Sequence, residues 1–143
     1  MSLQFSTTIR NAMLDAIESG AGAGQMTGIG VSAKIKFFTG TVPANCAAAD
    51  SGTKVSEFDL ASDWAANASA GAKSLSGTPL TVAAVAAGTL GYFRIYASDG
   101  TTCHMQGTIT ATGGGGDLTV DNTNVATSQN INITGFTLNA PGA

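Results

Sequence analysis

The sequence predicts a mainly β fold, an antiparallel β-sandwich or jelly-roll-like barrel of about seven or eight strands with one N-terminal α-helix. Beyond residue 30, apolar residues alternate with polar ones in short runs separated by turn-forming residues, whereas the first twenty residues have a helical period. The 143 residues match the length of a single domain. We therefore expect an N-terminal helix and glycine-rich tether at 1–24 and one β domain at 25–143.

The helix is predicted from Ser6 to Ser19, with Ser6 or Thr7 as its N-cap and Gly20 as its C-cap. Its apolar stripe repeats every third or fourth position: Ile9, Ala12, Met13, Ala16 and Ile17. The opposite face is polar: Arg10, Asn11 and Glu18. A short amphipathic helix must bury its stripe, either on its own sheet or on a neighbouring subunit, and the flexible segment 21–24 permits both.

The strands follow from alternation and turn chemistry. They are predicted over 31–37, 54–60, 80–85, 92–97, 102–112, 118–120 and 131–138. The pair Asp99 and Gly100 predicts a tight hairpin turn, and the phase slip at Gly135 predicts a bulge. In the strand over 92–97, Tyr92 and Tyr96 are expected on the outward face, opposite the buried residues.

Two long loops and a glycine run separate these strands. The loop over 40–53 contains Cys46, and in the loop over 61–77 the only tryptophan, Trp64, is expected to anchor a weakly packing segment to the core. The glycines at 113–116 end a strand without the Lys-Ser/Thr of a phosphate loop. They are therefore expected at a loop tip or a close backbone contact.

Composition excludes several functions. Only 10% of the residues are charged, against about 25% in an ordinary soluble domain. The net charge is -3, and no run of Lys or Arg is present to neutralise nucleic-acid phosphates. The longest apolar run, 82–88, is far shorter than the ~20 residues that cross a membrane, and the N-terminus lacks the pattern of a secretory signal. We expect no nucleic acid and no membrane as partner, synthesis in a cytoplasm, and a subunit of an assembly.

Few residues are suited to catalysis or metal binding. His104 is the only histidine, and its neighbour Cys103 points to the opposite face of a strand, so no Cys-His dyad is expected. The cysteines match no zinc spacing, and Asp117 and Asp121 fit turn capping better than calcium binding. Cys46 and Cys103 are expected to be free and buried after synthesis in reducing conditions, although they can pair in an oxidising medium. No enzyme, cofactor or metal is predicted.

Five segments resemble a family of small proteins encoded by tailed bacteriophages and prophages: 3–12, 43–52, 62–64, Gly91-Tyr92-Phe93-Arg94-Ile95-Tyr96 and Cys103-His104-Met105-Gln106-Gly107-Thr108-Ile109-Thr110. The resemblance runs from Leu3 to about Leu138. It implies a virion structural role, as a capsid decoration (cement) protein with a compact β fold on the outer capsid surface. The major capsid protein would be its partner, the chain would form a dimer or trimer, and no catalytic residues carry over.

The alternative is a tail or tail-fibre component with a receptor- or carbohydrate-binding role, which would need exposed aromatic side chains. For the cement role, the first helix is the candidate contact, with packing on the protein's own sheet as the other possibility. The candidate interface residues are Phe5, Ile9, Met13, Ile17, Trp64, Tyr92 and Tyr96.

Overall fold

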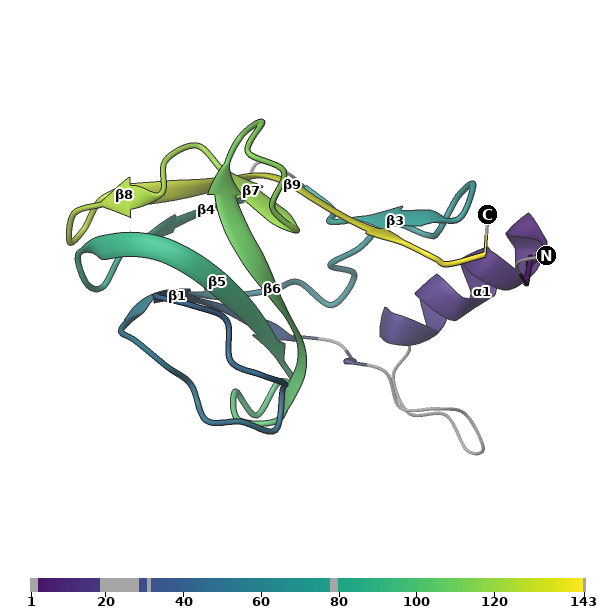
Figure 1. The fold of residues 1–143 in the computed structure, drawn as a ribbon, viewed down its shortest axis with the longest axis horizontal. Helices are drawn as coiled ribbons and strands as arrows, with labels where there is room; N and C mark the ends of the chain where they lie inside the picture. The colour runs from purple at the N-terminus through teal and green to yellow at the C-terminus, as the bar shows by residue number, and fades with distance from the viewer. Residues whose placement is uncertain (1–2, 19–28, 31, 78–79, 143) are drawn as a thin grey trace.

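The computed structural model describes residues 3–18, 29–30, 32–77 and 80–142. In these residues one helix precedes nine strands, which confirms the mainly β class (Figure 1). The elements are α1 (Thr7–Glu18), β1 (Lys34–Thr39), β2 (Lys54–Asp59), β3 (Ala72–Ser74), β4 (Leu80–Ala83), β5 (Gly88–Tyr96), β6 (Cys103–Ala111), β7 (Leu118–Val120), β8 (Asn124–Val125) and β9 (Asn130–Asn139). The short strands β3 and β8 were not predicted, because neither is long enough to show alternation.

The strands form one curled sheet in the order β2-β1-β5-β6-β7-β9, with β4 and β3 paired to different parts of β9 and β8 paired to β5. The edges of the curl meet, because the N–H of Val85 donates to the carbonyl of Val55 (2.7 Å) just beyond β4. The Ser56 hydroxyl on β2 reaches the carbonyl of Ala83 on β4 (3.4 Å). These contacts bring the sheet close to a closed barrel.

One pair of strands departs from the antiparallel expectation. β6 and β7 are parallel and are joined only by residues 112–117, far fewer than the dozen or more of an ordinary parallel crossover. The glycine run makes this possible: Gly113 and Gly115 have φ of 86° and 78°, and a Cβ on Gly114 would lie 2.7 Å from the Thr110 Cβ. The run is therefore a place of close backbone packing, as expected.

The inside of the curl holds the apolar core. Phe37 meets Phe58 edge to face with ring centroids 5.2 Å apart, and Phe93 meets Phe136 in the same way at 5.4 Å. Trp64 is 2% exposed and its Nε1 donates to the carbonyl of Gly30 (3.3 Å). The predicted anchoring role of this tryptophan is confirmed.

The turn at Asp99 joins β5 to β6, as predicted, but it is wider than a two-residue turn. The strands end and begin at Tyr96 and Cys103, because the Asp99 carboxylate accepts the N–H groups of Thr101 (2.8 Å) and Thr102 (2.9 Å). These bonds lower the pKa of Asp99, with the Thr102 hydroxyl contributing most.

The bulge in the last strand is confirmed. Thr119 on β7 pairs with Gly135 of β9, but the next residue of β7, Val120, pairs with Ile133. Thr134 is thus left as the extra residue of β9, and the inward face changes phase there.

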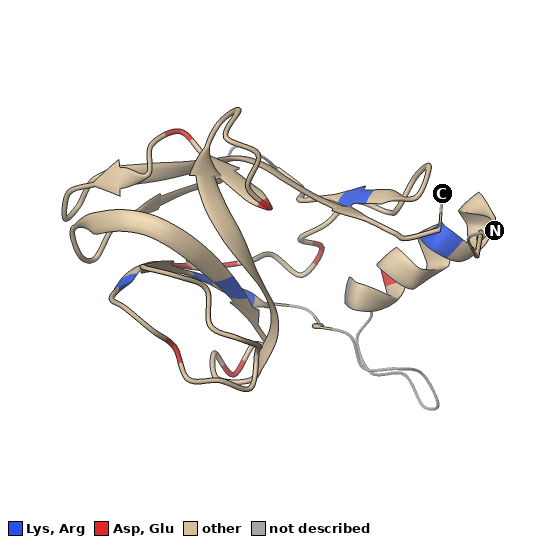
Figure 2. Cartoon of the chain, in the orientation of Figure 1, with Lys and Arg blue, Asp and Glu red and all other residues tan. Residues whose placement is uncertain are grey.

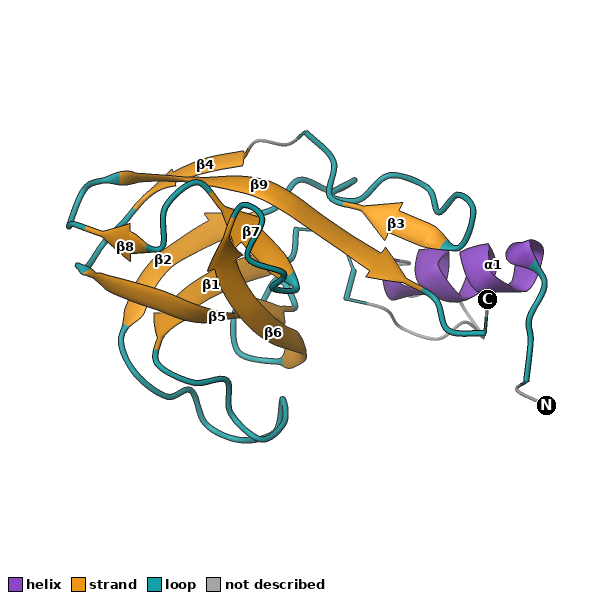
Figure 3. Cartoon of the chain, turned by 45° about the horizontal axis from the view of Figure 1, so that its top comes forward, coloured by secondary structure: helices purple, strands orange, loops and turns teal. Residues whose placement is uncertain are grey.

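β9 runs from the curled sheet to the far end of the molecule, where β3 pairs with its last residues and α1 lies against that ribbon (Figure 3). The chain ends lie side by side, because the N–H of Phe5 donates to the carbonyl of Gly142 (3.0 Å). Ser6 is the N-cap, since its hydroxyl accepts the N–H of Ile9 (3.3 Å). The predicted C-cap Gly20 and the tether 21–24 lie outside the described residues.

Candidate interaction surface on the N-terminal helix

α1 docks on the sheet through its polar face. The Arg10 guanidinium donates to the carbonyl of Ala140 (3.1 Å), and the Asn11 side-chain oxygen accepts the N–H of Gly71 (2.8 Å). Both partners are main-chain groups near the ends of β3 and β9. Of the two alternatives for the apolar stripe, packing on the protein's own sheet therefore holds only in part, because these main-chain groups bind polar side chains of the helix.

An ion pair strengthens this attachment. Asp15 accepts the N–H of Ala68 (2.8 Å) and a hydrogen bond from the ammonium of Lys73 (3.0 Å), whose side chain is 1% exposed. Lys73 also donates to the carbonyl of Ala66 (3.0 Å). The bond from Ala68, aided by the charge of Lys73, lowers the pKa of Asp15. The buried lysine thus has both a countercharge and a main-chain partner.

Two apolar residues complete the docked face. Leu14, which the predicted stripe did not include, is 4% exposed, and Ile17 packs against the core of the sheet. Together with Arg10, they follow the spacing of four and three residues that lines one side of a helix. Of the candidate interface residues on the helix, Ile17 therefore packs within the chain.

Four large hydrophobic residues of the N-terminal segment are exposed: Ile9 and Met13 lie one turn apart on α1, and Leu3 and Phe5 lie just before it. The exposed fractions are 75% for Leu3, 37% for Phe5, 49% for Ile9 and 37% for Met13. We call these four residues the apolar helix face. Outside it, the large hydrophobic residues classed as exposed in the described part of the chain are Val42 and Val85. Exposed apolar residues that occur close together in one segment mark an interaction site more than isolated ones do.

Charge is sparse over the whole fold (Figure 2). All six basic residues lie in described segments, and each one contacts a carboxylate or a main-chain carbonyl. They are Arg10, Lys34, Lys36, Lys54, Lys73 and Arg94. Two of the charged residues on α1, Arg10 and Asp15, are thus engaged with the sheet.

The tyrosines of β5 are not exposed. Tyr92 is 0% and Tyr96 3% exposed, because the β1–β2 loop (residues 40–53) covers the outer face of the sheet. The Tyr92 hydroxyl donates to the carbonyl of Ser51 (2.6 Å), and its ring stacks on Phe38 with centroids 5.0 Å apart. Tyr92 and Tyr96 therefore lie on the outward face of the sheet, as predicted, but the loop covers them, so they form no exposed aromatic patch; Trp64 is equally buried.

Arg94 holds this loop in place and was missed by sequence reasoning. Its side chain is 2% exposed, and Nη1 donates to the carbonyl of Ala48 (2.8 Å) and to Asp50 (2.7 Å). Nη2 donates to the carbonyl of Asn45 (3.0 Å) and to Gln106 on β6 (3.0 Å). The sequence signal for this role was an arginine between aromatic residues of an apolar strand. If such an arginine is buried, it needs hydrogen-bond acceptors from another segment of the chain.

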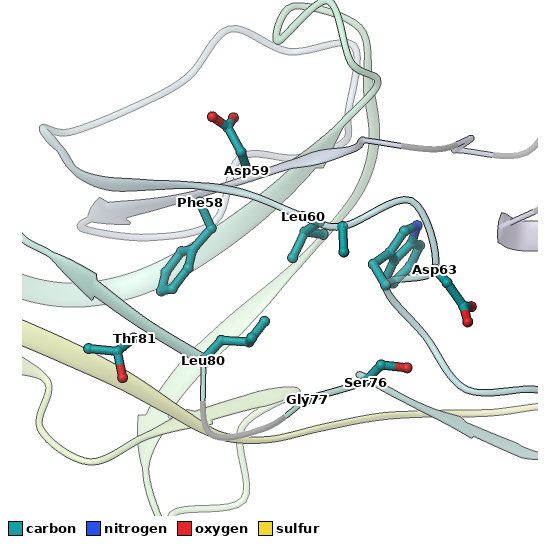
Figure 4. Close-up of a pocket in the computed structure, with 10 residues that line it drawn as sticks. Phe58, Asp59, Leu60, Asp63, Ser76, Gly77, Leu80 and Thr81 are labelled. Atoms are coloured by element: carbon teal, nitrogen blue, oxygen red, sulfur yellow. The ribbon is translucent and has the colours of Figure 1, made fainter.

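A hollow of about 350 Å³ opens beside the core, between the end of β2 and the start of β4 (Figure 4). Phe58 and Leu80 form apolar walls, while the carboxylates of Asp59 and Asp63 point in different directions. Asp59 is paired with Lys34. The hollow thus presents an apolar surface without two converging carboxylates, the pair on which glycosidase and acid/base chemistry depends.

Asp117 and Asp121 bind neighbouring strands. Asp117 accepts the N–H and the hydroxyl of Thr108 on β6 (both 2.8 Å), and Asp121 accepts the N–H of Asn132 on β9 (3.0 Å). These bonds differ from the expected turn capping, because each carboxylate reaches a residue nine or more positions away in the sequence. Across the described segments, no three His, Cys, Asp or Glu residues are grouped to hold a metal ion. His104 is exposed whereas Cys103 is half-buried, as expected for neighbours on opposite faces of a strand.

No helix in the described part of the chain has the length and apolar character needed to cross a membrane. Comparison of the chain with protein-family models, curated proteins and solved structures finds no match.

Proposed function

We propose that this chain is a structural protein of a tailed-bacteriophage virion, a capsid decoration (cement) protein that binds the outer surface of the major capsid protein lattice. The phage context comes from the resemblance of the segments quoted above. The docking role comes from one observation: the apolar helix face is exposed on a helix that is fixed to the fold by its other side. In this proposal, Leu3, Phe5, Ile9 and Met13 contact the capsid.

A helix that is already fixed to the fold is well suited to docking. Its side chains lose less conformational freedom on binding than those of a disordered arm would, so more of the apolar burial contributes to affinity. A single patch of this size binds weakly. A dimer or trimer with one copy of the patch per chain would bind the lattice far more strongly, because the second contact is intramolecular. We infer that the chain acts as such a homo-oligomer.

The structure offers less support to a tail or tail-fibre protein with a receptor- or carbohydrate-binding role. That function was linked to Tyr92 and Tyr96, whose rings are covered by the β1–β2 loop and cannot stack on a sugar without its removal. A tail location remains one outcome of the test below.

The test compares two variants with the same kind of substitution. In Ile9→Asp/Met13→Asp, charges are placed on the apolar helix face, and in Val85→Asp a charge replaces a 64% exposed residue in the β4–β5 turn, away from α1 (Figure 1). Each protein is added to tailed particles of the encoding phage that lack it, and the particles are examined by cosedimentation and cryo-electron microscopy. We expect regular density bridging capsomers with wild type and Val85→Asp, and none with Ile9→Asp/Met13→Asp.

Three results would contradict the proposal. Density on the tail, or no binding of the wild type to heads, would exclude the cement role. Binding of Ile9→Asp/Met13→Asp to heads would exclude the apolar helix face as the contact. Circular dichroism of the variant shows whether its fold is intact, and a folded variant that fails to bind is the expected result.

A further inference from the structure

The two cysteines of the chain meet at one place on the outer face of the sheet. Cys46 lies in the β1–β2 loop and Cys103 is the first residue of β6, yet both line a cavity of about 430 Å³ together with Arg94 and Tyr96. Both are free thiols and half-buried. The cysteines are therefore free, as expected, but only partly buried, and both line the same cavity.

The backbones that carry the two thiols are held in place by other contacts. Arg94 donates to the carbonyls of Asn45 and Ala48, on either side of Cys46 (3.0 and 2.8 Å). Cys103 is paired with Tyr96 of β5, and its Sγ donates to the carbonyl of Met105 (3.5 Å). The fold thus brings both thiols to one cavity without a covalent bond.

The side chains also interact directly. Burial, together with a hydrogen bond to the Cys46 side chain, raises the pKa of the Cys103 thiol to about 12. Because the thiolate is the attacking form, Cys103 is a poor first nucleophile near neutral pH. We therefore take Cys46, which lies in a loop, as the thiol that reacts first, and Cys103, which lies in a strand, as the second.

We propose that Cys46 and Cys103 form an intramolecular disulfide when the protein moves from a reducing to an oxidising medium, and that this bond locks the β1–β2 loop onto the sheet. The oxidant is a small disulfide such as oxidised glutathione. Cys46 loses its proton and attacks one sulfur of the oxidant, releasing one glutathione thiol and leaving a mixed disulfide. Cys103 then loses its proton and attacks the Cys46 sulfur, releasing the second glutathione. Two protein thiols are oxidised and one glutathione disulfide is reduced.

The bond would stabilise the folded protein after release from a cell. It joins positions far apart in the sequence, and a cross-link across a long segment reduces the conformational entropy of the unfolded chain most. It would also hold the β1–β2 loop in its position over Tyr92 and Tyr96. This inference does not depend on the proposed function, because it concerns only the chain itself.

The test uses the full chain, reduced and then incubated under native conditions with oxidised glutathione. Intact mass spectrometry should show the loss of two hydrogen atoms, and peptide mapping should show Cys46 linked to Cys103. Thermal unfolding is followed by the fluorescence of Trp64. Oxidation should raise the Tm by about 5–10 °C, and reduction of the disulfide should restore the original Tm. Proteolysis within residues 40–53 should slow.

Cys46→Ser and Cys103→Ser are the matched controls. Each should keep the reduced protein's Tm and show no oxidant-dependent rise. Two glutathiones attached to the wild type, covalent dimers as its main product, or a linkage that forms only after denaturation would each overturn the proposal. So would a Tm that is unchanged or lowered by the internal bond.

Discussion

Single polar residues attach the peripheral segments of this protein to its sheet. Arg94 binds the β1–β2 loop through its main-chain carbonyls, and Asp15 binds the helix to Ala68 and Lys73. Both contacts satisfy groups that burial would otherwise leave without partners, and leaving such groups unpaired costs more than the bond itself contributes. Loops and helices with little apolar area are held in this way.

The charge of Asp15 should stabilise the folded protein only above acidic pH. Its pKa in the folded protein is below the ordinary value of 3.8, so its contribution to stability is present above that pH and is lost as the pH falls through the folded-state pKa. Asp15→Asn should reduce the free energy of unfolding by about 1 kcal/mol at neutral pH, a value discounted for the 42% exposure of the side chain. Urea unfolding at about pH 7 and pH 3 should show this difference shrinking with acid.

Asp63→Asn is the control for that comparison. Asp63 is an exposed acidic residue at the hollow beside β2, and its replacement should change stability by less than about 0.5 kcal/mol at either pH. An Asp15→Asn variant that behaves like Asp63→Asn at neutral pH would show that the ion pair does not hold the helix.

At the scale of elements, β5 is shaped by a bulge where the β1–β2 loop begins. Phe38 of β1 pairs with Tyr92, but the next residue, Thr39, pairs with Leu90, which leaves Gly91 as the extra residue. A Cβ on Gly91 would lie 1.8 Å from the carbonyl oxygen of Gly40, which is main chain and cannot move aside. The strand and the loop can therefore approach each other only at a glycine.

Gly91→Ala should destabilise the fold by about 2–4 kcal/mol, because the backbone of β1 or β5 must shift to relieve the overlap. Thr89→Ala, on the same strand at an exposed position, should cost less than about 0.5 kcal/mol. Urea denaturation followed by fluorescence measures both values. Equal midpoints for the two variants would show that the bulge is not constrained by this contact.

At the scale of the whole molecule, the helix and the sheet form one unit. α1 is bonded to segments near residues 66–73 and to Ala140, its Leu14 is buried, and its partly buried Ile17 packs against the core of the sheet. The helix is too short to be stable in isolation. It should therefore unfold only when the sheet unfolds.

We expect coincident unfolding curves from the helical circular dichroism signal and from the fluorescence of Trp64, which lies in the core of the sheet. A helix that melts at a lower urea concentration than Trp64 would contradict this view. It would indicate that the helix is a detachable arm, and that any contact with a partner is made by a flexible segment and not by a fixed surface.

The alternation of residues predicted most of the strands and their faces. Ile35, Phe93 and Ile95 are buried inside, and the bulge near Gly135 lies where the phase slips. Local chemistry also predicted the Ser6 cap and the place of the hairpin at Asp99. These features depend on neighbours in the sequence, so a single chain contains enough information to predict them.

The sequence by itself determined the mainly β class, the N-terminal helix, the anchoring of Trp64 and the scarcity of charge. Only the tertiary structure decided which side of the helix is free, which face of β5 is covered, and that Cys46 lies beside Cys103. The physical reason is that these outcomes depend on main-chain groups distant in sequence. The carbonyl of Ala140 accepts a hydrogen bond from Arg10 and so holds the polar side of the helix against the sheet. The carbonyls of Asn45 and Ala48 accept hydrogen bonds from Arg94 and so hold the loop over the outer face of the sheet.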